Sequence, residues 1–321
     1  MLDNTTGATL WSHDTDFHFN DYVLTNDGKI IMVGYYLSNS ENKAMADLLV
    51  KSNDEEEQMS FALPVNIGSA GLLLSGNRLF VTGSLKGDNY RKKLLFGRDA
   101  DLSGMYVTLF DLSERNIIAS GEYPFTKEDV DVYLNAKEGK NKDNLVRWIG
   151  FQPYLMSDGH VCVKGEYAYS EIYNTPSRGS MNTHSGDYYQ FGKKGCILNM
   201  FDADGNLLWR KPYRNEIVGT TEVINDDVFD IQGNLCYYSM VCGKYKYSQT
   251  DVAASQDPRL LQTKLREIII DQEGNETVKV IDGKGEFGIA AQGYDAARTK
   301  RLFLMIEQGL FKSNVRLMVV E

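Results

Sequence analysis

Short stretches in which apolar and polar residues alternate recur along the whole chain. Most of them are joined by a turn that places glycine beside Asp or Asn, as at Asp27-Gly28, Gly76-Asn77, Asp158-Gly159 and Gly233-Asn234. Alternation with a period of two is the pattern of a half-buried strand, and these residue pairs supply the positive φ of a tight hairpin turn. The sequence therefore predicts antiparallel β-hairpins from one end to the other.

One hairpin is used more than once. Leu2–Trp11 and Phe201–Trp209 both begin with an apolar residue and Asp, turn at Gly and leave through apolar residues and Trp. Looser copies are Phe110–Asn116 and Ile270–Glu276. Repetition at this scale is the signature of a repeat architecture. Grouping the strands in fours gives repeats at about 17–64, 68–125, 146–213, 219–282, and 286–321 taken together with 1–14.

The two chain ends hold complementary parts of one repeat. The last repeat lacks a fourth strand, and the N-terminal segment supplies a strand that lacks its first three. Pairing of Val315–Val320 with Gly7–Ser12 would complete the unit and cover edges that would otherwise stay open. The predicted fold is all-β: a β-propeller of four-stranded antiparallel blades, closed by this pairing, in one domain over residues 1–321. Five blades is the simplest count, and six with one degenerate blade also fits.

The segment Leu2–Trp11 resembles the repeat of PQQ-type β-propellers, because Asp3, Thr6, Gly7 and Trp11 occupy matching positions. Asp202, Gly205 and Trp209 match more loosely. That family contains quinone-dependent dehydrogenases and cofactor-free envelope proteins that act as assembly scaffolds. The dehydrogenases carry an adjacent cysteine pair over the quinone and an eight-bladed ring. The resemblance therefore implies the non-catalytic branch, with no cofactor and a place in the cell envelope.

Composition excludes some partners. A net charge of −10 and a pI near 5.0 argue against nucleic acid, whose binding needs a clustered basic surface. No stretch reaches the ~20 apolar residues of a membrane helix. The N-terminus has no signal peptide and begins within a repeat, which fits a trimmed secreted precursor as well as a native cytosolic start. We expect an extracytoplasmic location on the first interpretation, and the oligomeric state stays open.

Motifs for catalysis or metal binding are weak. Asp202-Ala203-Asp204-Gly205-Asn206 looks like the start of a calcium loop, but Tyr213 stands where the bidentate Glu would be required. We interpret it as a turn and predict no metal site. The four cysteines (Cys162, Cys196, Cys236 and Cys242) and four histidines show no metal-ligand spacing and no catalytic motif, and the cysteines are expected to be buried thiols.

The long connections favour one face of the predicted ring. In a blade with strands A to D, the A–B and C–D turns share one rim, and the B–C and D–A connections share the other. The A–B and C–D turns are short throughout. The long segments are the B–C loops Ser84–Gly104, Glu166–Gly195 and Gly243–Lys264, and the D–A connection Thr126–Arg147 with a helical turn near Glu128–Leu134. Loops this long in a compact domain are functional or disordered.

Tyrosines among small polar residues give these loops the composition of a recognition surface. The candidate ligand-binding residues are Tyr169, Tyr173, Arg178, His184, Tyr188, Tyr189, Tyr245, Tyr247, Tyr90 and Arg91. The sequence thus predicts a non-catalytic binding or scaffold protein whose partner is a protein or a glycan. The alternative is a glycoside hydrolase or lyase that uses carboxylates or tyrosines at the central channel. A structural module of a larger envelope assembly is a third interpretation, and a surface insertion without a ligand also fits the loops.

Overall fold

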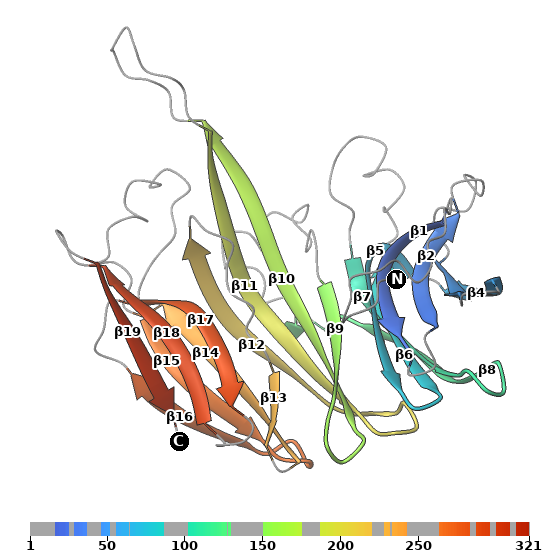
Figure 1. Cartoon of the computed structure of the whole chain (residues 1–321). Coiled ribbons are helices and arrows are strands. Elements are labelled where there is room, and N and C mark those ends of the chain that lie inside the picture. The colour runs from blue at the N-terminus through green and yellow to red at the C-terminus, as the bar shows by residue number, and fades with distance from the viewer. Residues whose placement is uncertain are drawn as a thin grey trace, which may run out of the picture. The chain divides into compact units, whose positions relative to one another are not determined.

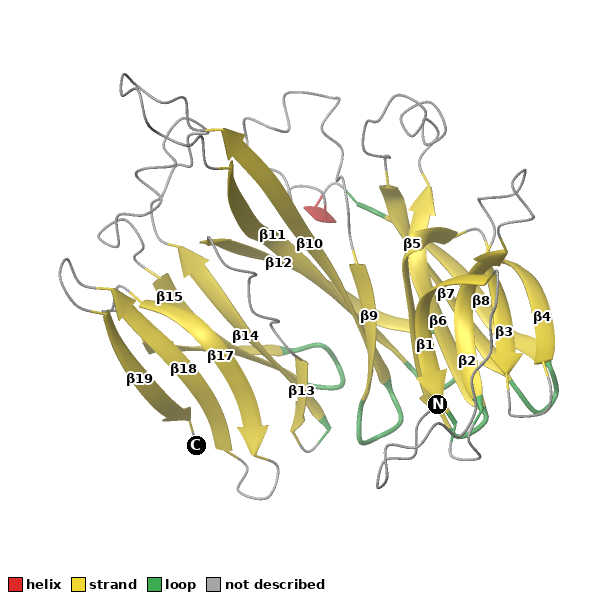
Figure 2. Cartoon of the chain, turned by 45° about the horizontal axis from the view of Figure 1, so that its top comes forward, coloured by secondary structure: helices red, strands yellow, loops and turns green. Residues whose placement is uncertain are grey.

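In the computed structural model, most of the described residues lie in β-strands (Figure 2). It describes residues 17–25, 29–36, 46–51, 56–63, 65–86, 102–126, 128–129, 150–174, 187–219, 228–231, 233–242, 263–282, 287–295, 300–308 and 313–320. These residues hold nineteen strands. Glu128 and Asp129 are helical. Within the described ranges, no helix combines the length and the apolar character that crossing a bilayer requires.

The strands form five sheets (Figure 1). The first contains β1 (Phe17–Leu24), β2 (Ile30–Tyr36), β3 (Ala46–Lys51) and β4 (Glu56–Leu63). The second contains β5 (Val65–Ser75), β6 (Arg78–Lys86), β7 (Leu102–Asp111) and β8 (Asn116–Pro124). The third contains β9 (Gly150–Leu155), β10 (Val161–Asn174), β11 (Asp187–Phe201) and β12 (Leu207–Gly219).

The remaining strands form the fourth and fifth sheets. The fourth contains β13 (Val228–Ile231), β14 (Asn234–Cys242), β15 (Thr263–Ile270) and β16 (Glu276–Asp282). The fifth contains β17 (Phe287–Asp295), β18 (Lys300–Gln308) and β19 (Ser313–Val320). In every sheet, neighbouring strands are also consecutive in the sequence. The registers of the hairpins are antiparallel, for example Arg78↔Asp111 between β6 and β7.

Successive antiparallel meanders of this kind are the blades of a propeller, so the predicted fold class is confirmed at the level of the sheets. The predicted closing strand Gly7–Ser12 lies outside the described residues, and ring closure stays a prediction. Within the described residues, the fifth sheet has three strands. The organisation of residues 1–321 as one domain also stays a proposal.

Glycine makes most of the described tight turns at the ends of the hairpins, whereas Arg115, with φ 56°, serves the turn between β7 and β8. Positive φ angles occur at Gly76 (58°), Gly159 (87°), Gly205 (85°), Gly233 (83°) and Gly274 (84°). Side-chain-bearing residues rarely adopt this conformation, which is why each of these five turns has a glycine. These glycines therefore adopt the positive φ of a tight turn, as we inferred from the hairpin pattern in the sequence.

The chain divides into two compact units. The first comprises Met1–Leu155, Gly159–Glu166 and Leu198–Arg210, and the second comprises Met156–Asp158, Tyr167–Ile197 and Lys211–Glu321. In the first unit, β5 contacts both β1 and β9, so the first strands of three successive sheets adjoin. The core cluster of this unit includes Ile31, Val33, Leu79, Val81 and Phe110, which come from the first two sheets.

The middle strands of the second sheet are buried on both faces. All residues from Gly104 to Phe110 in β7 are buried, as are Leu79 to Leu85 in β6. The fourth strand, β8, is instead exposed or half-buried along its length. A strand covered on both faces reads as a continuous apolar run rather than as an alternation. Cys162, Cys196 and Cys236 are buried thiols in the middle strands of the third and fourth sheets, as predicted.

One expectation about loop boundaries was wrong. The predicted loop Glu166–Gly195 is largely strand, because β10 continues to Asn174 and β11 begins at Asp187. Tyrosine has a high strand propensity, and it carries the hairpin past the point where the apolar pattern ends.

Candidate functional site

The third sheet extends past its first strand. β9 pairs with β10 from Val161 to Glu166, and β10 then continues for the residues Tyr167–Asn174. β10 is hydrogen-bonded to β11, which begins at Asp187. We call the β10 residues 167–174 and the β11 residues 187–195 the arm. Part of the predicted polar loop is therefore a β-hairpin of fixed strand direction.

The structure places four of the ten candidate ligand-binding residues, all of them on the arm. Tyr169 and Tyr173 lie on β10, and Tyr188 and Tyr189 lie on the neighbouring strand β11. The other six fall outside the described residues: Arg178, His184, Tyr245, Tyr247, Tyr90 and Arg91. Three of the four predicted long segments also lie mostly outside them, at 87–101, 130–147 and 243–262.

The D–A connection after the second sheet begins with a capping box. The backbone N–H of Thr126 donates to Oδ2 of Asp129 at 2.8 Å, and the N–H of Asp129 donates to Oγ1 of Thr126 at 3.2 Å. This reciprocal pair satisfies two donors that the start of a helical turn leaves open. Asp129 is only 1% exposed. We call residues 123–129 the root of the connection.

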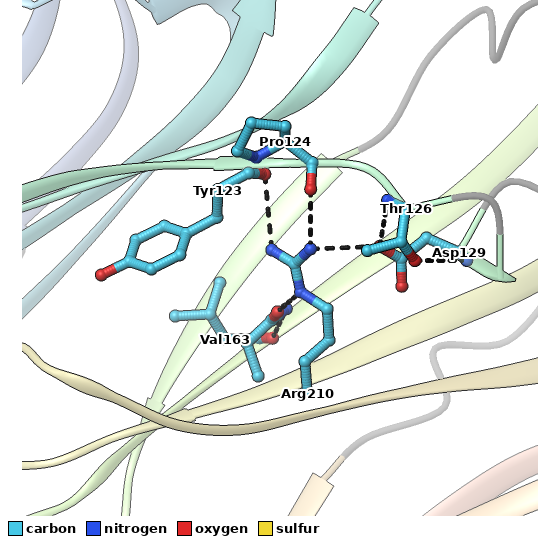
Figure 3. A network of polar contacts seen from close by, with 7 residues as sticks. Tyr123, Pro124, Thr126, Asp129, Val163 and Arg210 are labelled. Carbon is cyan, nitrogen blue, oxygen red and sulfur yellow. Dashed lines mark hydrogen bonds and ion pairs between the residues drawn. The ribbon is translucent and has the colours of Figure 1, made fainter.

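Arg210 of β12 holds this root (Figure 3). Its Nη1 donates to the carbonyl oxygen of Pro124 at 2.9 Å and to Oδ2 of Asp129 at 3.1 Å. Its Nη2 donates to the carbonyl oxygen of Tyr123 at 3.4 Å. The planar guanidinium of Arg210 thus donates four hydrogen bonds, and the fourth is donated by Nε. One side chain joins the last strand of the third sheet to the end of β8.

Asn199 orients the guanidinium of Arg210. Nε of Arg210 donates to Oδ1 of Asn199 at 2.8 Å, and Nδ2 of Asn199 donates to the carbonyl oxygen of Val163 at 3.1 Å. Asn199 is 1% exposed and lies on β11, while Val163 lies on β10. The chain of contacts therefore runs from the base of the β10–β11 hairpin to the root of the D–A connection.

Aromatic side chains pack beside this network. The ring of Tyr123 meets the ring of Phe201 edge to face with 5.3 Å between centroids, and Phe201 meets Phe80 in the same way at 6.1 Å. Burial raises the pKa of the Tyr123 hydroxyl, the charge of Arg210 acts against this, and the charge of Asp202 adds to it. Tyr123 is therefore a neutral packing residue in this site.

The Asp202 carboxylate accepts hydrogen bonds that close the C–D turn of the third sheet. Its Oδ1 accepts from the backbone N–H groups of Asp204 and Asn206 at 3.0 and 2.8 Å, and its Oδ2 accepts from Nδ2 of Asn206 at 2.9 Å. Burial would raise the pKa of the Asp202 carboxyl, but these hydrogen bonds and the nearby charge of His160 outweigh it and hold the pKa below 3.8. Among the described residues, no three His, Cys, Asp or Glu side chains form a group that could hold a metal ion.

Two carboxylates on first strands accept backbone N–H groups on both oxygens. Asp21 of β1 accepts from the N–H of Tyr22 at 2.9 Å and from the N–H of Leu72 in the second sheet at 2.7 Å. Asp230 of β13 accepts from the N–H of Gly233 at 2.9 Å and from the N–H of Ser157, which follows β9. Each carboxylate therefore connects its own first strand to a neighbouring sheet.

Sequence reasoning missed Arg210, Asn199 and Asp129. The Thr126-Lys127-Glu128-Asp129 spacing is that of a capping box and agrees with the helical turn that the sequence predicts near Glu128–Leu134, of which Glu128 and Asp129 are described. Nothing in the sequence links that turn to Arg210, which lies 81 residues away. A contact between residues so far apart in the sequence can be identified only from the three-dimensional arrangement of the two sheets.

Comparison with known proteins gives matches by structure only. No protein-family model matches the chain. No curated protein matches it either. One similar structure is the β-propeller domain of the Trilobed protease from Pyrococcus furiosus, with TM-score 0.40 and 11% identity over 95% of this chain and 67% of that one.

Two further similar structures are larger proteins. The polysaccharide lyase Uly1 has TM-score 0.37 and 8% identity over 93% of this chain and 56% of that one. The quinohemoprotein alcohol dehydrogenase ADHIIG from Pseudomonas putida HK5 has TM-score 0.37 and 11% identity over 90% of this chain and 44% of that one. The chain thus spans about half the length of these two proteins.

Proposed function

We propose that this chain is a non-catalytic β-propeller that binds a protein or a glycan through the long connections at one edge of its sheets. The observation that carries the proposal is the contrast between the two ends of the hairpins. Glycine turns close the A–B and C–D ends, at Gly76, Gly159, Gly205, Gly233 and Gly274. The long connections and the arm are at the B–C and D–A ends, where a scaffold of rigid strands can present them.

The arm is the part of this surface that we assign to ligand contact. It carries Tyr169 and Tyr173 on one strand and Tyr188 and Tyr189 on the adjacent strand. Tyrosine supplies large amphipathic contact area at low cost in side-chain entropy. A hairpin holds such residues in a more defined arrangement than a loop does, which favours recognition because less order has to be gained on binding.

The resemblance of Leu2–Trp11 to PQQ-type repeats extends the proposal to an extracytoplasmic scaffold in the cell envelope, without a cofactor. The proposal keeps the remaining candidates as ligand-binding residues, namely Tyr90, Arg91, Arg178, His184, Tyr245 and Tyr247. The enzymatic alternative is less favoured because Asp21 and Asp230, two carboxylates on first strands, each accept two backbone N–H groups. A channel catalyst would have to use other carboxylates.

The test compares the intact chain with a variant in which Tyr169–Lys193 is replaced by an Asn-Gly turn, which suits a two-residue hairpin. Both are applied to an array of purified polysaccharides and to crosslinking in the source cell with mass spectrometry. We expect a polysaccharide or protein that only the intact chain retains. The double variant Tyr188→Ala/Tyr189→Ala should weaken that binding about tenfold or more without lowering the melting temperature.

The matched control is Tyr22→Ala, which removes a tyrosine that is 54% exposed on β1 of the first sheet. It should bind like the intact chain. Equal retention by the intact chain and the arm-deleted variant would overturn the assignment of the arm. Turnover of a retained polysaccharide would favour the enzymatic alternative.

A further inference from the structure

We draw no further inference here: the strongest candidate, the exposed apolar side chains of Ile117 and Ile118 on β8 and of Leu208 on β12, carries nothing because nothing among the described residues shows what covers them.

Discussion

The second and third sheets meet in two different ways. Between their first strands, the backbones approach so closely that a Cβ built on Gly71 would lie 2.5 Å from the carbonyl oxygen of Phe151. Between their last strands, a side chain as long as Arg210 reaches from β12 to the end of β8. We call these contacts the inner seam and the outer seam.

The two seams depend on opposite properties of the sequence. The inner seam needs a missing side chain and one small hydroxyl, since Oγ1 of Thr82 lies 3.3 Å from the carbonyl oxygen of Gly71 and 3.2 Å from that of Phe151. The outer seam needs charge, length and several acceptors at once. A tightly packed contact is destabilised by any added side-chain volume. A buried polar network is destabilised when the loss of one partner leaves another polar group without a hydrogen bond.

The largest effect should come from adding one methyl group to the inner seam. Gly71→Ala should lower the free energy of unfolding by about 3 kcal/mol, because the crowding atom is a backbone oxygen that cannot move aside cheaply. Urea denaturation measures this. The control is Gly76→Ala, where nothing lies within 4 Å of the added Cβ and only the φ of +58° is strained. It should cost about 1 kcal/mol, and equal costs would show that the inner seam is not tightly packed.

The outer seam should respond less strongly to the loss of its buried amide. Asn199→Ala removes the hydrogen bonds to Arg210 and to the carbonyl of Val163. We expect a loss of about 2 kcal/mol in urea denaturation, since the variant leaves buried polar groups unsatisfied. Asn206→Ala removes an exposed asparagine amide in the turn nearby and should cost less than about 1 kcal/mol. A smaller loss for Asn199→Ala than for Asn206→Ala would contradict the buried network.

Acid should weaken the C–D turns of the third and fourth sheets by a smaller amount. The pKa of the Asp202 carboxyl is held below 3.8 by the groups described above. Hydrogen bonds from the side chain and backbone of Asn275 do the same in the equivalent turn of the fourth sheet, lowering the pKa of Asp271. A lowered pKa contributes stability above 3.8 that is lost as the pH falls through the folded value.

Melting temperature measured from pH about 5 down to about 2 should therefore fall, and Asp202→Asn should reduce that slope. The Asp202 carboxyl is half-exposed, so we expect less than about 1 kcal/mol from it after solvent screening. An unchanged slope in Asp202→Asn would show that the turn does not depend on the ionised carboxylate. Asp271→Asn provides the matched variant in the fourth sheet.

The smallest effect should have the opposite sign and is expected in the fourth sheet, at Glu267 of β15. Burial raises the pKa of this carboxyl above 4.5, although the charge of Lys279 acts against it. A raised pKa contributes stability below 4.5 that is lost as the pH rises through the folded value. Glu267→Gln should therefore be about 0.5 kcal/mol more stable than the intact chain at neutral pH and equal to it near pH 4. Lys279→Met should widen the difference in stability between neutral pH and pH 4. The prediction would be contradicted if the stability of neither variant, relative to the intact chain, depended on pH.

Much of the fold could be predicted because each sheet is a local structure. The turns at Gly76-Asn77, Asp158-Gly159 and Gly233-Asn234 are fixed by glycine conformations, and the strands that they join follow each other in sequence. The second copy of the C–D turn is equally local: Asp271 accepts from the N–H of Asn275 at 2.7 Å, as Asp202 does from Asn206. Short-range patterns carry enough information for such elements.

The length of the arm and the two seams could not be predicted. Polar residues among the tyrosines of residues 166–195 indicated a loop, while the strand propensity of tyrosine favoured the hairpin that the structure contains. The inner seam depends on Gly71 meeting Phe151, and the outer seam on Arg210 meeting Asp129. Both join residues whose sequence neighbours give no sign of the partner.

The consecutive order of the strands also has a consequence for how the chain folds. Every strand pair inside a sheet joins near neighbours in sequence, whereas Arg78 and Ala203, in contact at 2.6 Å, are 125 residues apart. Closing a long loop costs more entropy than closing a hairpin, so contacts of this kind slow folding. We expect individual sheets to form early on the folding pathway, with φ-values near one in their hairpins. The contacts between sheets then form on the native side of the barrier, and their substitutions should speed unfolding rather than slow folding.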